Sequence, residues 1–244
     1  MELKRLLPFL VVALAGCQRE QLDDCITTTG AMRTETRELQ AFDAIEIEDR
    51  IDLVLEERAA GSVAVEGGAN LLGQVITEVK DGTLHISNNM RCRWVRSFKP
   101  RITVHAPLSN LCRMTLRGTG DVRCTDTLRC DYFLLEQWGA EGSTELKVNL
   151  SRLDIALHTG AGDALITGRC DEANLYSGIM APIDASGLRA SIVRVNNSSV
   201  ADFRCWAMDA LDAQVRSVGD VYYRGDPPNV QSTIVGSGRL IKVE

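Results

Sequence analysis

Aromatic residues are scarce in this chain, and positive charge is not in excess. Phe, Trp and Tyr make up 5% of its 244 residues, while Gly occurs 20 times. Together with many Val, Ile, Leu and Thr, this composition favours a fold stacked from small, β-branched side chains. The formal net charge is −6. Nucleic-acid-binding proteins need a basic stripe to displace the counterions of phosphates, so we expect no nucleic-acid partner.

The sequence also lacks common motifs of catalysis and metal binding. No CxxC spacing exists, and the three histidines, His85, His105 and His158, are scattered along the chain. A serine nucleophile would need a setting such as Gly-x-Ser-x-Gly, which is absent. We therefore expect no metal site, no cofactor and no enzymatic activity.

Only one long apolar run is present, and it lies near the N-terminus. Leu6–Leu14 follows two basic residues and precedes Leu-Ala-Gly-Cys, which ends at Cys17. The run is too short to span a bilayer as a helix. This order is typical of a signal peptide, and its last four residues resemble the bacterial lipobox. We predict a lipoprotein signal peptide at residues 1–16 and lipidation of Cys17. An ordinary secretory signal with a chance cysteine is the alternative.

Acylation of Cys17, for example with palmitate, would anchor an otherwise soluble chain to a membrane of the bacterial cell envelope. Residues 17–36 are mostly polar and without periodicity, so they are predicted to be a tether. Gln18 follows the lipidated cysteine, where some inner-membrane lipoproteins carry Asp. This favours the outer membrane.

The second half of the chain contains a repeat built around small residues and aspartate. Short alternating strands flank each copy, and the copies recur at about twenty residues. This period predicts a β-solenoid of about seven short coils over residues 111–244. The residues expected to form its corners are Gly118, Gly120, Asp121, Gly160, Gly162, Asp163, Gly219, Asp220, Gly236 and Gly238.

Corner geometry explains these residue types. Glycine adopts a positive φ without a side-chain penalty, and aspartate accepts hydrogen bonds from nearby backbone amides. Asn196-Asn197-Ser198 is expected to form a corner in the same way, because Asn tolerates the left-handed region. The last rung needs a polar or covered outer edge. The side chains expected to stack inside the coils are Leu116, Val122, Ile155, Leu165, Val215 and Val221.

Residues 37–110 have the alternation of antiparallel or mixed β-strands. Ile76–Ser87 predicts a hairpin whose two-residue turn is Asp81-Gly82. Ala69–Val75 is expected to form one or two helical turns. The predicted fold class is therefore all-β, with an N-terminal β region followed by a solenoid.

Several short motifs, in order, resemble the bacterial surface domain known as the putative auto-transporter adhesin, head GIN domain. They are Phe42-Asp-Ala-Ile-Glu-Ile, Ile51-Asp-Leu-Val-Leu, Asn70-Leu-Leu, Val79-Lys-Asp-Gly-Thr-Leu-His-Ile, Ile102-Thr-Val-His-Ala-Pro-Leu, Leu116-Arg-Gly-Thr-Gly-Asp-Val and Gly236-Ser-Gly. The resemblance implies one continuous domain over residues 37–244 and a right-handed β-helix-like C-terminal part. It also implies export and no established biochemical activity.

Cysteine usage is compatible with export. Setting Cys17 aside leaves seven of the eight cysteines, an odd number. Neighbouring rungs of a solenoid are ~4.8 Å apart, which lies within the Cα separation that a disulfide tolerates. Cys112, Cys124 and Cys130 are the group predicted to be bonded, and the sequence leaves their pairing open.

One basic stretch interrupts the acidic chain. Its candidate contact residues are Arg91, Arg93, Trp94, Arg96, Phe98 and Lys99. Arginine forks there could bind the phosphates of lipid A, an anionic glycan or the acidic face of a partner. The structural alternative is an exposed hairpin extension that buries Cys92 and Trp94.

Two further sets of residues have a functional and a structural interpretation. Trp138, Trp206, Tyr222 and Tyr223 could form a platform for carbohydrate, or they could cover the core. The corner aspartates could bind calcium or act as a catalytic pair, although turn capping is the simpler interpretation. We predict a lipid-anchored, non-catalytic binding or adhesion module that contacts an envelope glycan or a surface protein. The alternatives are a carbohydrate-active β-helix enzyme and a purely structural envelope lipoprotein.

Overall fold

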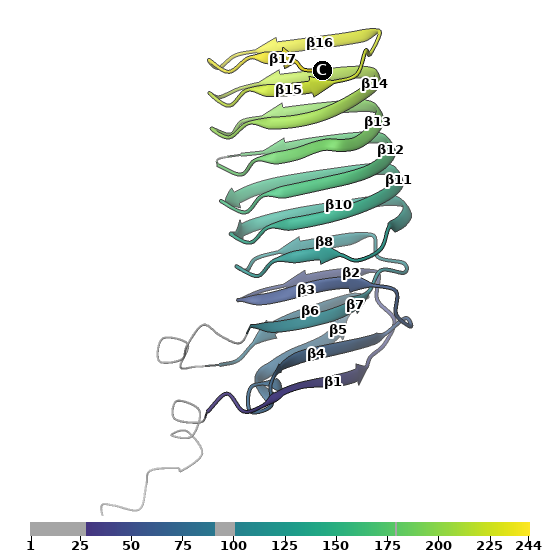
Figure 1. Ribbon diagram of the computed structural model, residues 1–244, viewed down its shortest axis with the longest axis vertical. Helices are drawn as coiled ribbons and strands as arrows, with labels where there is room; N and C mark the ends of the chain where they lie inside the picture. The colour runs from purple at the N-terminus through teal and green to yellow at the C-terminus, as the bar shows by residue number, and fades with distance from the viewer. Residues whose placement is uncertain (1–27, 91–100, 179) are drawn as a thin grey trace, which may run out of the picture.

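Alternating apolar and polar residues form the strands of the fold, and these strands join into one mixed sheet of 17 strands. The computed structural model describes residues 28–90, 101–178 and 180–244. The sheet curls on itself and rises as a stack, from β1 at one end to β16 and β17 at the other (Figure 1). The all-β prediction is confirmed.

The N-terminal region contains nine short strands. They are β1 (Met32–Glu38), β2 (Ala44–Ile47), β3 (Ile51–Glu56), β4 (Ser62–Gly68), β5 (Val75–Lys80), β6 (Thr83–Asn88), β7 (Ile102–Pro107), β8 (Arg113–Leu116) and β9 (Val122–Cys124). Their order in space differs from their order in the chain. β2 pairs in parallel with both β6 and β8, and β3 pairs in parallel with both β7 and β9. The layer formed by β2 and β3 therefore lies between two layers that follow it in sequence.

Antiparallel strands close the lower end of this stack. β4 pairs with β1 on one side and with β7 on the other, and β5 pairs with β6. β1 begins at Met32, so residues 32–36 belong to the sheet and the tether is shorter than predicted. This strand has no apolar periodicity because it lies at an edge, where most of its side chains are exposed. The Arg37 guanidinium fixes it by donating to the carbonyls of Leu72 and Val75.

The predicted hairpin is confirmed. β5 and β6 pair around Asp81 and Gly82, whose φ values of 49° and 76° fit a tight two-residue turn. The predicted helical turn shrinks to the 3₁₀ segment η2 (Leu72–Gln74). In the part of the chain that the structure describes, no helix has the length and apolar character needed to cross a membrane.

The second region is a solenoid of about six turns, as its ladder shows. Its strands are β10 (Leu128–Ala140), β11 (Thr144–Gly160), β12 (Ala164–Ser177), β13 (Ile183–Asn197), β14 (Phe203–Val215), β15 (Val221–Arg224), β16 (Asn229–Ile234) and β17 (Leu240–Lys242). All pair in parallel, and one ladder runs through Val122, Thr144, Ala164, Ile183, Phe203, Val221 and Leu240. Seven equivalent positions enclose six turns, which corrects the expected seven coils.

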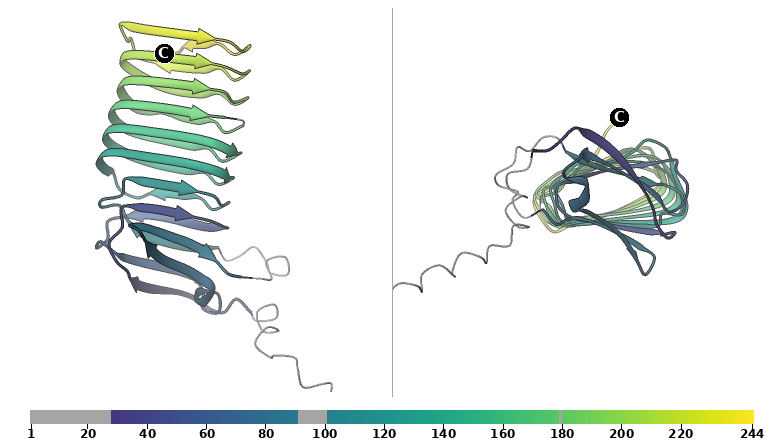
Figure 2. Two further views of the ribbon diagram at one scale, coloured as in Figure 1. Left: turned by 180° about the vertical axis from the view of Figure 1, so that it is seen from behind. Right: turned by 90° about the horizontal axis from the view of Figure 1, so that it is seen from below.

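Aliphatic side chains fill the tube, which is oval in cross-section (Figure 2). One inward column contains Phe133, Leu153, Ala173, Val193 and Leu211, all at most 1% exposed. The predicted inward residues are buried except Leu165, which is 37% exposed. That prediction was wrong because Ala164 and Ile166 are the inward residues of this strand, and Leu165 alternates outward between them.

The upper end of the solenoid differs from the expectation of a polar or covered edge. Every residue of β16 is exposed, and Val230 and Ile234 occupy positions directly above the buried Leu211 and Val215. Within the described residues, no strand pairs with β16 beyond β14. Apolar side chains of the last layer therefore face solvent.

Candidate binding surface

One corner of the solenoid is lined by small residues on every turn. Two residues before the ladder described above, the register aligns Gly120, Gly142, Gly162, Ala181, Ala201, Gly219 and Gly238. A Cβ atom on Gly142 would lie 1.9 Å from the carbonyl oxygen of Gly120, and one on Gly238 would lie 2.3 Å from that of Gly219. Successive corners therefore contact through their backbones.

The reason for glycine differs from the predicted one. Gly160 has a φ of 101°, but Gly120, Gly162, Gly219 and Gly238 do not have positive φ values. At these corners a side chain is excluded because a carbonyl oxygen of the preceding rung lies too close, and not because of the backbone conformation of the glycine. The Asn196–Ser198 corner also avoids the left-handed region. Its Asn197 side chain instead donates to the carbonyls of Ala201 and Gly219.

Aspartates follow the small residues and bind the neighbouring rung. The Asp52 carboxylate accepts a hydrogen bond from the amide of Asp121 at 3.0 Å, and Asp121 accepts one from the amide of Ser143 at 3.1 Å. Asp220 accepts one from the amide of Arg239 at 2.8 Å. These contacts are what a turn cap makes.

Two of the corner aspartates, Asp121 and Asp220, are also bonded to arginines, whereas Asp163 accepts a hydrogen bond from the Ser143 hydroxyl. Burial acts to raise the pKa of Asp121, but hydrogen bonds from Arg101 and from the Ser143 amide bring it below its ordinary value. Arg239 lowers the pKa of Asp220 in the same way. Among the described residues, no group of three or more His, Cys, Asp and Glu side chains could hold a metal ion. The contacts of Asp121 and Asp220 with backbone amides and arginines are those of turn caps.

The coil bends where two consecutive residues point outward, as at Asp131 and Tyr132. Beyond this bend, β10–β14 present the surface that we name the aromatic–polar face. Its members are the outward residues Tyr132, Glu136, Trp138, Arg152, Asp154, Ala156, His158, Glu172, Asn174, Tyr176, Arg194, Asn196, Asp212 and Gln214.

A hydrogen-bond network holds the side of this face that is nearer the bend. Asp154 accepts bonds from Tyr132 at 3.0 Å, from Arg152 at 3.1 Å and from Asn174 at 2.6 Å. Asn174 also donates to Glu172, which forms an ion pair with Arg194. The side chains are thus fixed before any partner arrives.

The network keeps both of its carboxyls ionised. Burial acts to raise the pKa of Asp154, but the donors around it lower the pKa below its usual value. The Asn174 hydrogen bond and the charges of Arg194 and Arg152 lower the pKa of Glu172. Glycoside hydrolysis needs one carboxyl that stays protonated beside an ionised partner. In this pair the pKa values of both carboxyls are lowered, so neither is kept protonated. The arrangement therefore suits binding.

Aromatic rings occupy the other side of the face, nearer the C-terminal ends of β10, β11 and β12. The Trp138 and His158 rings stack with centroids 3.8 Å apart and planes 15° apart, and Tyr176 lies 5.7 Å from His158. Trp138 remains 41% exposed. The face carries a shallow hollow of about 370 Å³, with the small Ala156 between larger neighbours. Stacked rings beside fixed polar groups can accept the flat face of a sugar and its hydroxyls.

Residues 41–227 match the family described as putative auto-transporter adhesin, head GIN domain. The chain belongs to this family. No match was found among curated proteins. The proposed resemblance of the sequence to head GIN domains is therefore confirmed over most of the chain.

Several solved structures have similar folds. A putative adhesin from Bacteroides fragilis is 26% identical with a TM-score of 0.79, over 87% of this chain and 97% of that one. A putative adhesin from Parabacteroides distasonis is 21% identical with a TM-score of 0.66, over 88% and 98%. A putative lipid binding protein from the same species is 19% identical with a TM-score of 0.64, over 88% and 98%. The last two show the fold alone.

The predicted contact residues of this head GIN domain fall partly outside the described residues. Cys17 does, and so do Arg91, Arg93, Trp94, Arg96, Phe98 and Lys99. The four predicted platform aromatics do not gather in one place. Trp206 and Tyr222 lie under the guanidinium groups of Arg189 and Arg204, and Tyr223 packs against the core. Only Trp138 belongs to the aromatic–polar face.

The cysteines predicted to be bonded separate into a neighbouring pair and an outlier. All five described cysteines are free thiols. Burial, together with the neighbouring Cys112, raises the pKa of the Cys130 thiol to about 11. Cys124 instead meets the backbone amide of Lys147. Cys124 is separate because it lies on β9. Cys112, in contrast, directly precedes β8, the strand that pairs with β10, where Cys130 lies.

The sequence analysis missed most of the aromatic–polar face. Its signal was present at every second position, at intervals close to twenty residues, as in Asp154, Asn174 and Arg194. The corner glycines can be recognised from the sequence because the same residue type recurs at each copy of the repeat. The outward residues of successive rungs differ in residue type and share only their position in the repeat. They can therefore be grouped only once the strand register is known.

Proposed function

We propose that this head GIN domain is the binding part of a lipid-anchored protein in the bacterial cell envelope, and that it acts without catalysis. The observation that carries the proposal is the aromatic–polar face. The Asp154 and Glu172 carboxyls of its network are hydrogen-bonded and ionised, while Trp138 remains exposed and Tyr176 lines a shallow hollow. A preformed surface of this kind loses little entropy on binding. An envelope glycan is the partner that its rings and amides favour, with a surface protein as the alternative.

Membership of an adhesin family supports the binding role, and so does the similarity to the Bacteroides fragilis protein. The lipobox-like residues before Cys17 support the anchor. The first described residues lie at the β1 end of the stack, away from β16 and β17 (Figure 1). A tether there would raise the solenoid from the membrane, with the outer membrane of the envelope as the expected site.

Fractionation of the natural host tests the anchor. Replacing Cys17→Ser should move the protein from the membrane fraction to the soluble periplasmic fraction, because acylation needs the thiol. Cys25→Ser is the matched control and should remain with the membrane. Membrane retention of both variants would refute lipid anchoring.

Binding to isolated cell envelopes tests the adhesion role. The double variant Trp138→Ala/Tyr176→Ala should bind about tenfold more weakly, because exposed aromatic anchors dominate such contacts. Tyr222→Ala removes an aromatic ring outside this face and should bind like the wild type. Equal binding by all three proteins would reject the face. Release of reducing sugars from envelope glycans by the wild type would reject the non-catalytic role.

A further inference from the structure

A second surface lies on the other side of the bend at residue 131. There, one outward column crosses six successive rungs from β10 to β15, and each member pairs directly with the next. We name it the arginine column, and its members in order are Arg129, Asn149, Arg169, Arg189, Trp206 and Arg224. Five rung spacings give it a length of ~24 Å. Four arginines in one column are unexpected on a chain whose net charge is −6.

Three of these arginines differ from the arginines of the aromatic–polar face in their ionic partners. Within the described residues, Arg129, Arg169 and Arg189 form no ion pair, whereas Arg152 forms two and Arg194 forms one on the aromatic–polar face. Arg169 donates to the Asn149 side chain at 2.9 Å. The column also places Arg169 directly opposite Arg189. Like charges in that position repel, so an anion that bridges them would relieve the repulsion.

Trp206 adds a flat surface to the column. The guanidinium of Arg189 lies 4.5 Å from the centroid of its ring, which holds both side chains in position. Arg224, one rung further along, donates to the backbone carbonyl of Glu244 at 3.0 Å. The upper part of the column is therefore ordered, although Arg189 and Arg224 are exposed.

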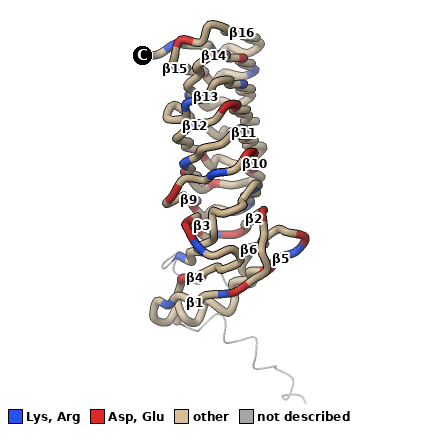
Figure 3. Tube along the Cα trace, turned by 90° about the vertical axis from the view of Figure 1, so that its right-hand side faces the viewer, with Lys and Arg blue, Asp and Glu red and all other residues tan. Residues whose placement is uncertain are grey.

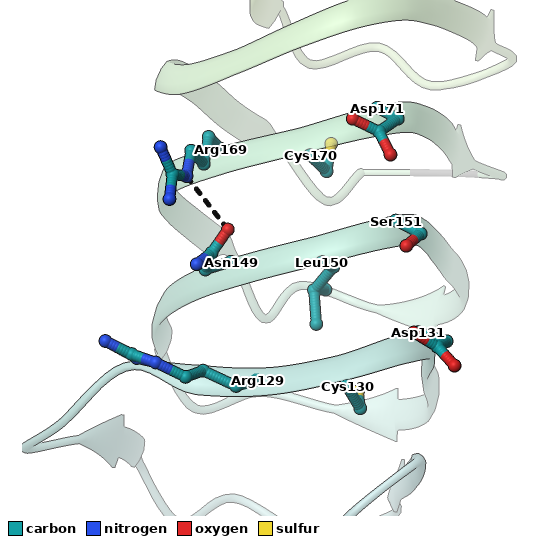
Figure 4. A pocket seen from close by; sticks show the side chains of 9 residues that line it. All are labelled: Arg129, Cys130, Asp131, Asn149, Leu150, Ser151, Arg169, Cys170 and Asp171. Atoms are coloured by element: carbon teal, nitrogen blue, oxygen red, sulfur yellow. Dashed lines mark hydrogen bonds between the residues drawn. The ribbon is translucent and has the colours of Figure 1, made fainter.

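A hollow of about 630 Å³ opens beside the lower part of the column. Figure 4 shows Arg129, Asn149 and Arg169 along one side of it and an acidic side opposite. That opposite side consists of Asp131, Ser151 and Asp171, with Cys130, Leu150 and Cys170 between the two sides. The site thus offers cations on one side and hydrogen-bond acceptors on the other.

The two sides select the kind of anion. Guanidinium forks bind carboxylates with paired hydrogen bonds, and aspartates accept hydrogen bonds from hydroxyl groups. A broad phosphate surface, such as a membrane or a nucleic-acid duplex, would bring its charges against Asp131 and Asp171. A ligand that carries both carboxylates and hydroxyls satisfies both sides. In Figure 3, basic and acidic positions are interspersed along the stack.

We infer that the arginine column binds a linear acidic polysaccharide whose sugars carry carboxylates, with the chain lying along the stack. The inference rests on the proposed binding function and names a ligand class for it, at a site separate from the aromatic–polar face. The one-residue width of the column suits a single extended chain, and Trp206 offers a ring on which a sugar can lie.

Polygalacturonate is the probe, with neutral dextran as its uncharged counterpart, and calorimetry measures binding to the purified chain. The wild type should bind polygalacturonate and not dextran, and added salt should weaken binding. Arg129→Gln/Arg169→Gln/Arg189→Gln should bind about tenfold or more weakly, because three charge-assisted contacts are lost. The matched control, Arg33→Gln/Arg113→Gln/Arg216→Gln, removes three exposed arginines outside the column and should retain binding.

Three outcomes would overturn the inference. Equal loss in both triple variants would show a general charge effect. Equally tight, column-dependent binding to vesicles containing anionic phospholipid would show that the column recognises phosphate surfaces. If the wild type does not bind polygalacturonate, carboxylated polysaccharides are ruled out as the ligand class of the column. The proposed function would then still stand if Trp138→Ala/Tyr176→Ala weakens binding to cell envelopes, so the two failures are distinguishable.

Discussion

The two regions of the sheet use the same parallel pairing, but the chain visits their layers in different orders. In the solenoid, β12 pairs with β11 and β13, its neighbours in sequence. In the N-terminal region, β2 pairs with β6 and β8, and the chain returns past its own earlier layer. Each solenoid turn therefore depends on its neighbours in sequence, as in other repeat proteins. The N-terminal layers depend on contacts between distant segments, which close only when the whole region folds.

The two ends of the stack differ as well. Antiparallel strands β1, β4 and β5 cover the lower end, whereas β16 and β17 leave the upper end open within the described residues. An unpaired edge is the place where a solenoid frays first. One sheet therefore combines a base that folds as a unit with a stack of turns that are coupled only to their neighbours. Four perturbations can break or sharpen this view.

The largest effect should come from a corner glycine at the junction between the two regions. A Cβ on Gly120 would lie 1.8 Å from the carbonyl oxygen of Ile51, in a stack that continues on both sides. We expect Gly120→Ala to lower the free energy of unfolding by more than about 4 kcal/mol, because backbone must move. Urea titration followed by circular dichroism measures the loss.

Two other glycines provide controls for this substitution. Gly238→Ala meets the Gly219 carbonyl at 2.3 Å, but in the last rung, where fraying relieves the clash at a cost of about 1 kcal/mol. Gly73→Ala meets nothing within 4 Å and should be neutral or slightly stabilising. A Gly238→Ala variant as unstable as Gly120→Ala would contradict the difference between base and turns.

Two buried leucines test cooperativity directly. Leu53 and Leu211 are both at most 1% exposed, the first in the base and the second near the open end. Each Leu→Ala change should create a cavity that costs about 2–5 kcal/mol. Hydrogen exchange should show protection lost throughout the sheet for Leu53→Ala, and lost mainly from β13 to β17 for Leu211→Ala. Identical exchange patterns would mean that the sheet unfolds as one unit.

A covalent link across the junction should stabilise the base. Oxidised glutathione should join Cys112 to Cys130 and release two molecules of reduced glutathione. Closing a loop of about 18 residues stabilises by about 3 kcal/mol. The reaction should be slow near neutral pH, since the pKa of Cys130 is raised to about 11 and the thiolate is scarce. Peptide mass mapping should find this link in the wild type and in Cys124→Ser, while a link through Cys124 would refute the pairing.

The predictable part of the fold is the part with a local signal. Asp81-Gly82 specifies its hairpin, and the recurring glycines specify the solenoid, because each feature is encoded within one repeat. The stacking of β6 under β2 has no such signal, because it depends on which distant edges are still free. Leu165 illustrates the same limit on a small scale. Its apolar character suggested burial, but only the register with Ala164 and Ile166 shows that it points outward.

The candidate sites follow the same rule. The corner aspartates repeat in identity and were found from the sequence. In the arginine column, Asn149 stands between Arg129 and Arg169, so the residue type does not repeat. The twenty-residue interval between these positions is recognised only after the strands are aligned. The basic stretch around Arg93 and Trp94 lies outside the described residues, and its role as a contact surface stays a prediction.

The smallest effect concerns Asp121, which connects the two regions through Arg101 and the Ser143 amide. Its pKa in the folded protein is below the ordinary value, so its contribution is present near neutral pH and is lost as pH falls below about 4. The carboxyl is 53% exposed, and solvent screening limits the contribution to about 0.5 kcal/mol. Asp121→Asn should therefore be slightly less stable than the wild type near neutral pH, and the two should converge in acid.

Asp209→Asn removes an exposed carboxyl without an ion pair among the described residues and should show no such convergence. Urea titrations of all three proteins on both sides of pH 4 give the comparison. A gap for Asp121→Asn that persists in acid would mean that the ion pair with Arg101 contributes nothing to stability, and that the effect of the substitution comes from the amide hydrogen bond.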